Sequence, residues 1–358
     1  MHITKTKCGL LLGLLIGCMC TYFVLNARSS IQMNSNSWMA NLKRFTIQHK
    51  QIDESENANK TEESVKDSTD KMKLKTKQDP IDILPFTIYE KANQNIVIYN
   101  RMPKCGSSTM MTFLKKLSYG KFKMMHSYIY DQKQLNDTND ILNFVESFRD
   151  CESRKCVTDR HIHFVNFENF GLKQPIYFNI IREPFENVLS AYYFAYGKRK
   201  PMIKRAEYYK SHNNPTFEEC IRININIIQD VDDWCFIGPI AKRYVVWFCG
   251  HEAICSTNMT YGLQKAKHNI DKYHMLVGLT EEYAFTLKAM ERILPSFFEG
   301  IGHFNASTRV NQIAESKKKR PSSKMIIEYV KMRLKENYEI YYYVKQKFHA
   351  TLKKLNVS

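Results

Sequence analysis

Glycine and proline are scarce in this chain, at 13 and 10 of 358 residues, so it is neither collagenous nor of low complexity. It lacks the CxxC pairs of zinc ribbons and the GxxxxGK[ST] loop of nucleoside triphosphatases. Acidic residues are outnumbered by basic ones, 36 to 53, which gives a net charge of +17. We therefore expect a polyanionic partner: nucleic acid, anionic lipid, nucleotide phosphates or an acidic polysaccharide. The 44% of apolar residues suffices for a packed core.

One long apolar segment occurs, at the N-terminus. Residues 8–27 carry no charge and are long enough to span a bilayer as a helix. A cleaved signal peptide is the alternative, but its apolar region would be shorter, and Leu25-Asn26-Ala27 is a poor cleavage site. We predict a cytoplasmic tail at 1–7, a signal-anchor transmembrane helix at 8–27 and a lumenal remainder, which is a single-pass type II topology.

The glycosylation sequons and the later cysteines fit a lumenal chain. Sequons occur at Asn59, Asn136, Asn258, Asn305 and Asn356. In an oxidising lumen, close spacing predicts three disulfides, which are Cys151–Cys156, Cys220–Cys235 and Cys249–Cys255. Zinc binding is the rival interpretation, but no His-rich cluster accompanies these cysteines. Cys105 is then the free thiol.

The chain is expected to contain a stem and one α/β domain. Residues 28–92 are polar, with eight acids and six bases between 51 and 80, and this composition cannot fold alone. A domain at 93–358 follows, in which Ile96–Tyr99 and Ile176–Ile181 have the continuous apolar pattern of buried parallel strands. Apolar spacing predicts helices over Met110–Leu117, from Pro184, over Lys265–Leu276 and Glu281–Leu294, and a basic helix or helix pair over Met325–Leu355.

Two short segments could bind phosphate groups. Lys104 to Thr109 joins the first strand to its helix, and a helix N-terminus with glycine, hydroxyls and a lysine suits an anion. Arg182 closes the second strand, and Ser190 lies two turns into the next helix, so the pair could hold a second phosphate. Taken separately, each segment is equally compatible with an ordinary capped strand–helix turn.

Together, these motifs resemble the cofactor site of Golgi sulfotransferases, which use 3′-phosphoadenosine 5′-phosphosulfate (PAPS). The segments Arg160–Phe167, Pro175–Arg182, Trp247–His251 and Leu276–Glu282 are further similar to the uronyl 2-O-sulfotransferases, which modify uronic acids in glycosaminoglycans. Heparan-specific members have a histidine where this chain has Asp159, which favours the chondroitin/dermatan branch. The resemblance implies a P-loop-like sulfotransferase domain with a central parallel sheet flanked by helices.

The resemblance also assigns roles to residues. Lys104 would hold the phosphosulfate and neutralise the departing phosphate, beside the cofactor loop of Cys105, Gly106, Ser107, Ser108 and Thr109. Arg182 and Ser190 would hold the 3′-phosphate, and the product would be adenosine 3′,5′-bisphosphate, with no metal required. His161 would be the catalytic base, because imidazole can take the proton of an attacking hydroxyl. His163 is a weaker catalytic candidate, since a lone histidine is more often structural.

Basic residues near these motifs are candidates for glycan contact. A cluster of this kind is Lys198, Arg199, Lys200, Lys204 and Arg205. Lys317 to Lys319 could touch the nucleotide or the glycan, with Lys319 assigned to the nucleotide, and Arg101 could pair with a uronate carboxylate. Charge runs are otherwise solvated surface.

The sequence thus predicts a Golgi membrane enzyme that sulfates the 2-hydroxyl of iduronate or glucuronate in a glycosaminoglycan. One alternative is a catalytically inactive, membrane-anchored glycosaminoglycan-binding protein, and another is the same chemistry on heparan sulfate. A nucleotide kinase would need a metal-ligating acid near the loop, and none is evident. A nucleic-acid partner is not expected, and the resemblance implies a homo-oligomer, trimeric in the heparan branch. Motifs do not decide the acceptor glycan.

Overall fold

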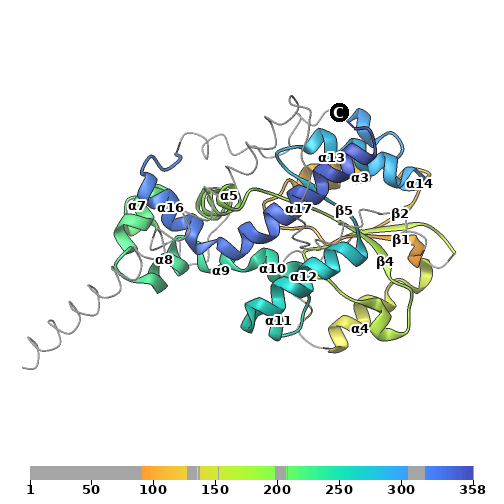
Figure 1. The fold of residues 1–358 in the computed structure, drawn as a ribbon, viewed down its shortest axis with the longest axis horizontal. Helices are drawn as coiled ribbons and strands as arrows, with labels where there is room; N and C mark the ends of the chain where they lie inside the picture. Colours follow the sequence, from red (N-terminus) through yellow and green to blue (C-terminus); the bar gives the residue numbers. More distant parts are fainter. Residues whose placement is uncertain are drawn as a thin grey trace, which may run out of the picture. The chain divides into compact units, whose positions relative to one another are not determined.

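The computed structural model describes residues 91–126, 135, 138–151, 153–197, 207, 209–304 and 319–357 of the chain. Within them, five strands form one parallel sheet in the order β2-β3-β1-β4-β5 (Figure 1). The strands are β1 (Asn93–Tyr99), β2 (Lys123–His126), β3 (Cys156–Asp159), β4 (Pro175–Ile181) and β5 (His274–Leu279). The predicted central parallel sheet is confirmed, and its two predicted strands, β1 and β4, lie side by side.

The strands form because both faces of the sheet are covered. In β1, Val97 and Tyr99 contribute to one apolar cluster, whereas Ile96 and Ile98 contribute to another on the opposite face. This alternation is the two-residue period of a strand, and burial on both sides explains the lack of polar residues. Tyr99 stacks on Phe178 of β4 with ring centroids 4.6 Å apart, which ties the two central strands together.

Helices follow β1 and β4 directly, as predicted. Helix α3 (Ser107–Leu117) begins after Gly106, and α5 (Pro184–Gly197) begins with proline, whose fixed φ suits a helix first turn. The helices around them are α4 (Thr138–Glu146), α7 (Phe217–Asn224), α8 (Ile228–Trp234), α9 (Gly238–Ala241), α10 (Arg243–Cys249), α11 (Ile254–Thr257), α12 (Met259–Tyr273), α13 (Tyr283–Ile293), α14 (Pro295–Phe298), α16 (Lys324–Arg333) and α17 (Lys335–Lys354). Short 3₁₀ turns are η1 (Arg149–Cys151), η2 (Phe167–Phe170) and η3 (Ile301–His303).

The structure corrects one predicted helix and divides another into two. The helix predicted over Lys265–Leu276 is wrong at its end, because α12 stops at Tyr273 and His274 starts β5. The six residues of β5 are all buried and pair with β4, so tertiary burial overrides the helical spacing. The basic C-terminal segment is a helix pair, α16 and α17, and α17 runs along the domain past α10, α12 and α13 (Figure 1).

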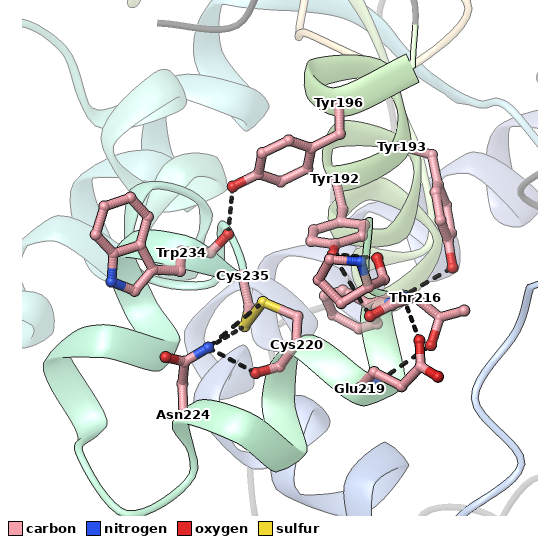
Figure 2. The surroundings of a disulfide bond; sticks show 11 residues. Tyr192, Tyr193, Tyr196, Thr216, Glu219, Cys220, Asn224, Trp234 and Cys235 are labelled. Atoms are coloured by element: carbon pink, nitrogen blue, oxygen red, sulfur yellow. Dashed lines mark hydrogen bonds between the residues drawn. A yellow bond between two sulfur atoms is a disulfide. The ribbon is translucent and has the colours of Figure 1, made fainter. Parts of the chain in front are cut away.

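The three predicted disulfides are present, and Cys105 is the free cysteine among the described residues, in a buried position. Figure 2 shows Cys220–Cys235 joining α7 to the end of α8, with Tyr192, Tyr193 and Tyr196 of α5 close by. Tyr192 Oη donates to the Pro215 carbonyl at 2.7 Å, and Tyr196 Oη donates to the Trp234 carbonyl at 2.9 Å. The disulfide therefore closes a segment that supports one face of α5.

Several predicted features lie outside the described residues. They are the tail at 1–7, the membrane helix at 8–27, nearly all of the stem, and residues Asn59, Asn136, Asn305, Lys198, Arg199, Lys200, Lys204 and Arg205. In the part of the chain that is described, none of the helices is both long and apolar enough to cross a bilayer.

Candidate active site

The loop from Lys104 to Thr109, here called the phosphate loop, connects β1 to α3 at the carboxyl edge of the sheet. Lys104 and Gly106 both have positive φ, 66° and 76°. A Cβ on Gly106 would also lie 3.0 Å from Cε2 of Tyr283, whose hydroxyl donates to the Gly106 carbonyl at 3.2 Å. Only glycine satisfies both the backbone conformation and this close contact.

The phosphate loop presents donors suited to an anion. Ser107 and Ser108 begin α3 and are partly exposed, whereas Thr109 is buried. The first N–H groups of a helix lack partners within the helix and carry a partial positive charge. The Lys104 Nζ lies 3.5 Å above the ring of Phe194 on α5, so its charge stays at the end of the loop. An oxyanion would meet backbone N–H groups, hydroxyls and an ammonium here.

The second predicted phosphate position lies between β4 and α5. Arg182 Nη2 is 3.2 Å from Oε2 of Glu186, whose carboxylate also pairs with Arg320. Ser190 is buried two turns into α5, and the Tyr193 hydroxyl one turn further donates to the Lys319 carbonyl at 2.8 Å. The structure therefore brings Arg182, Arg320 and the backbone of Lys319 to the same helix.

Buried polar contacts hold the two phosphate positions together. Asn187 of α5 donates from Nδ2 to the Pro103 carbonyl at 2.9 Å and to Sγ of Cys105 at 3.1 Å. Tyr244 of α10 donates its hydroxyl to the Arg182 carbonyl at 2.5 Å. Burial raises the pKa of the Cys105 thiol to about 12, so this cysteine is a structural hydrogen-bond partner and not a nucleophile.

His161 follows β3 and is held in position by the segment that follows β1. Its Nδ1 lies 2.7 Å from the Arg101 carbonyl, and a carbonyl only accepts, so Nδ1 carries the proton and Nε2 holds the lone pair. Burial, together with the nearby charges of Arg101 and Arg243, lowers the pKa of His161 to about 4. The ring is thus neutral at pH 7 and can accept a proton at Nε2.

Arg101 occupies an unexpected environment. Its Nε lies 3.5 Å from Oδ2 of Asp159, and the two side chains are 4% and 0% exposed. Asp159, the predicted point of difference from the heparan-specific pattern, therefore pairs with a buried arginine whose backbone carbonyl holds His161. The predicted contact of Arg101 with a uronate would have to compete with this ion pair.

A cavity of about 570 Å³ opens beside His161 and Pro103. Its other residues include His163, Lys242, Arg243, Trp247 and His251. We refer to it as the histidine cavity. The ring of His163 lies 5.3 Å from that of Trp247 and 4.9 Å from that of His251, and burial lowers the pKa of His163 to about 3. His161 and His163 both line this cavity, and residues 162–166 form no strand.

Sequence reasoning missed Lys242, Arg243 and Asn187. Arg243 Nη1 donates to Oδ1 of Asn187 at 3.3 Å, so α10 is linked through α5 to the phosphate loop. Asn187 carried little signal, because it lies on the side of α5 opposite the apolar residues Phe185, Val188 and Tyr192, where a polar side chain is ordinarily solvated. Lys242 and Arg243 carried none, since two bases before an apolar segment are typical of solvated helix ends.

The remaining predicted positions are peripheral. Asn258 is exposed and caps α12 by accepting from the Tyr261 N–H at 3.0 Å, and Asn356 is exposed near the C-terminus, so both stay predicted glycosylation sites.

Among the described residues, no group of three His, Cys, Asp or Glu side chains is arranged to hold a metal ion.

Comparison with known proteins identifies a family and several relatives of this chain. The profile of the Sulfotransferase family matches residues 89–344. The uronyl 2-sulfotransferases of Homo sapiens and Mus musculus are 30% and 29% identical to this chain, over 78% of it and 66% of their own length. A heparan sulfate 2-O-sulfotransferase of Caenorhabditis elegans is 30% identical over 73% of this chain and 81% of its own. The chain thus spans just under two thirds of the human and mouse relatives, and the predicted family resemblance is confirmed.

Proposed function

Because this chain belongs to the sulfotransferase family, we propose that it transfers a sulfuryl group from PAPS to the 2-hydroxyl of a uronic acid in a glycosaminoglycan. The observation that carries the proposal is the position of His161 in a cavity whose lining also includes Pro103, the residue immediately before the phosphate loop. An anion-binding loop supports a nucleotide donor, and a neutral histidine beside it supports an attacking hydroxyl.

The residues of the phosphate loop fit the donor. Gly106 leaves no room for a side chain beneath Tyr283, and the start of α3 offers its N–H groups where a 5′-phosphosulfate would lie. Lys104 would balance charge at that group, and Arg182 with Ser190 would hold the 3′-phosphate. The donor, when bound, supplies a sulfuryl group on a phosphate leaving group. Arg182 would then exchange the carboxylate of Glu186 for the phosphate.

His161 would act as the general base. Nδ1–H is oriented by the Arg101 carbonyl, so Nε2 is the nitrogen that takes the proton of the attacking 2-hydroxyl. The hydroxyl oxygen would attack sulfur in line with the departing phosphate, which Lys104 would neutralise. The contribution of the protein is then mainly positioning and electrostatic stabilisation.

We further propose an acceptor of the chondroitin/dermatan type. Asp159 supports this choice, because it places a buried carboxylate where the heparan-specific pattern has a histidine. The three disulfides fit an oxidising compartment and so support a lumenal, Golgi location for the domain. The basic residues Lys198 to Arg205 would extend the contact with the glycan chain.

A panel of acceptors tests the proposal. Full-length protein is incubated with PAPS carrying labelled sulfate and with desulfated dermatan, chondroitin or heparan, and the labelled disaccharides are identified. Transfer to the uronate 2-hydroxyl of dermatan or chondroitin is expected. Transfer to heparan alone would leave the reaction standing and overturn the assigned branch. Folded protein that binds adenosine 3′,5′-bisphosphate and the glycan but transfers nothing would be the inactive binding protein.

A further inference from the structure

Arg243 stands out among the cations around the histidine cavity. It begins α10, is partly buried and lines the cavity together with His161. Within the part of the chain that the structure describes, its polar partner is the neutral amide of Asn187, at 3.3 Å, and no carboxylate forms an ion pair with it. Burial lowers the pKa of Arg243, yet a guanidinium stays charged at neutral pH.

The other arginines at the site each have a carboxylate partner, although Arg182 shares Glu186 with Arg320. Arg101 pairs with Asp159 at 3.5 Å, and Arg182 pairs with Glu186 at 3.2 Å. A charge removed from water without an opposite charge costs several kcal/mol, so such a group is retained where a ligand supplies the missing anion. Arg243 therefore lines the histidine cavity with no carboxylate partner among the described residues, and a ligand in the cavity can supply the opposite charge.

We propose that Arg243 binds the carboxylate of the uronic acid whose 2-hydroxyl reacts at His161. This assignment rests on the proposed function. A guanidinium matches a carboxylate with two parallel N–H···O bonds. Asn187 accepts a hydrogen bond from one end of the Arg243 guanidinium but carries no charge to neutralise it. The remaining N–H groups of the guanidinium are therefore oriented before the sugar binds. In a uronic acid, the carboxylate and the 2-hydroxyl lie on opposite sides of one ring, so two fixed protein groups define the orientation of the acceptor.

The same contact would explain selection of uronic acid over the neighbouring amino sugar. An amino sugar has a hydroxymethyl group in place of the carboxylate and leaves the guanidinium unmatched. Loss of a hydrogen bond to a charged group costs about 1.5–3 kcal/mol, or about 10–100-fold in affinity. Arg101 could supply this selectivity only if its ion pair with Asp159 were broken.

The test compares an acceptor with and without its carboxylates. Full-length protein loaded with adenosine 3′,5′-bisphosphate is titrated with a desulfated dermatan hexasaccharide and with its carboxyl-reduced counterpart, by calorimetry. Wild-type protein is expected to bind the first about 10–100-fold more tightly. In Arg243→Met, the two oligosaccharides should bind equally, at the affinity of wild type for the reduced one. Arg243→Lys should restore part of the difference, because it keeps the charge and loses the fork.

Lys242→Met is the matched control. Lys242 is the adjacent cation on the same cavity, but it is exposed, and its Nζ donates to the Ser256 carbonyl at 3.4 Å. This variant removes the same charge and should keep the preference for the carboxylate. Affinity for adenosine 3′,5′-bisphosphate should stay near wild type in Arg243→Met, because the phosphate loop is unchanged, whereas the lost hydrogen bond to the buried Asn187 should lower the melting temperature by about 2–8 °C.

Three outcomes overturn the assignment. They are equal binding of the two oligosaccharides by wild type, an undiminished preference in Arg243→Met, and a loss of nucleotide affinity in that variant with the preference intact, which would move Arg243 to the donor site. Because binding is measured without turnover, a protein that distinguishes the carboxylate but transfers no sulfate would refute the proposed reaction and leave the role of Arg243 standing.

Discussion

The phosphate loop and the histidine cavity are neighbours built in opposite ways. The phosphate loop is local: six consecutive residues, Lys104 to Thr109, join a buried strand to a helix N-terminus. The histidine cavity is assembled from a distance, with His161 from the segment after β3 and Arg243 and Trp247 from α10. Anion binding can use the backbone of one turn, whereas proton transfer to a sugar needs side chains set at fixed positions by separate elements.

The largest effect is expected in the histidine cavity. His161→Ala should lower the rate of sulfate transfer by about 100-fold to 10,000-fold, which is the usual contribution of a general base. Affinity for adenosine 3′,5′-bisphosphate, measured by calorimetry, should be unchanged because His161 does not belong to the phosphate loop. His212→Ala, at an exposed histidine on the surface, is the control. Near-normal turnover in His161→Ala would remove this residue from its role.

The next effect concerns the support behind His161. Asp159→Asn leaves the buried guanidinium of Arg101 without its carboxylate and should lower the free energy of unfolding by about 3 kcal/mol, measured in urea. Asp150→Asn is the matched control, because Asp150 pairs with Arg154 at 3.9 Å on an exposed surface, where such a pair contributes less than about 1 kcal/mol. Equal losses of unfolding free energy in the two variants would mean that the buried Arg101–Asp159 pair stabilises the fold no more than an exposed ion pair does.

On the side of the phosphate loop, substitution should act on nucleotide binding. Lys104→Ala should weaken binding of adenosine 3′,5′-bisphosphate by about 10-fold or more, because one charge-assisted contact is lost. Lys115→Ala, an exposed lysine near the other end of α3, should bind normally. If Lys104→Ala bound the nucleotide as tightly as wild type, the assignment of the donor to this loop would be wrong.

The smallest effect is a shift in pH dependence. Burial and the charges of Arg101 and Arg243 lower the pKa of His161 to about 4, so the base is neutral from pH 6 to 8. The acceptor kcat/KM should therefore be level across that range and fall only below it, and the acid limb should move to higher pH in Arg243→Met. Since the folded-state pKa lies below the ordinary value of 6.5, this histidine also makes the fold less stable as pH drops from about 6.5 toward 4. An acid limb at pH 6.5 in wild type would contradict the buried, neutral ring.

The same contrast explains what could be predicted from the sequence. Strands β1 and β4, the presence of α3, the start of α5, and the pairs Cys151–Cys156 and Cys249–Cys255 follow from patterns only a few residues long. Lys104 and Arg182 were identified for that reason. Arg243 was not identified, because its proposed role depends on Asn187, 56 residues earlier, and on the absence of a carboxylate among its described neighbours. The end of α12 was misjudged because burial of β5 between other elements is not visible in its helical spacing.

The short spans of the disulfides have a consequence for biosynthesis. The paired cysteines are 5, 15 and 6 residues apart. Closing a short loop costs little chain entropy and is fast, so each native pair can meet soon after its second cysteine is exposed to an oxidant. Cys105 precedes all of them in the chain and is shielded only once β1 and α3 have packed. Among the cysteines that the structure describes, mispairing during oxidative folding should therefore involve mainly Cys105, in the interval before the sheet closes over it.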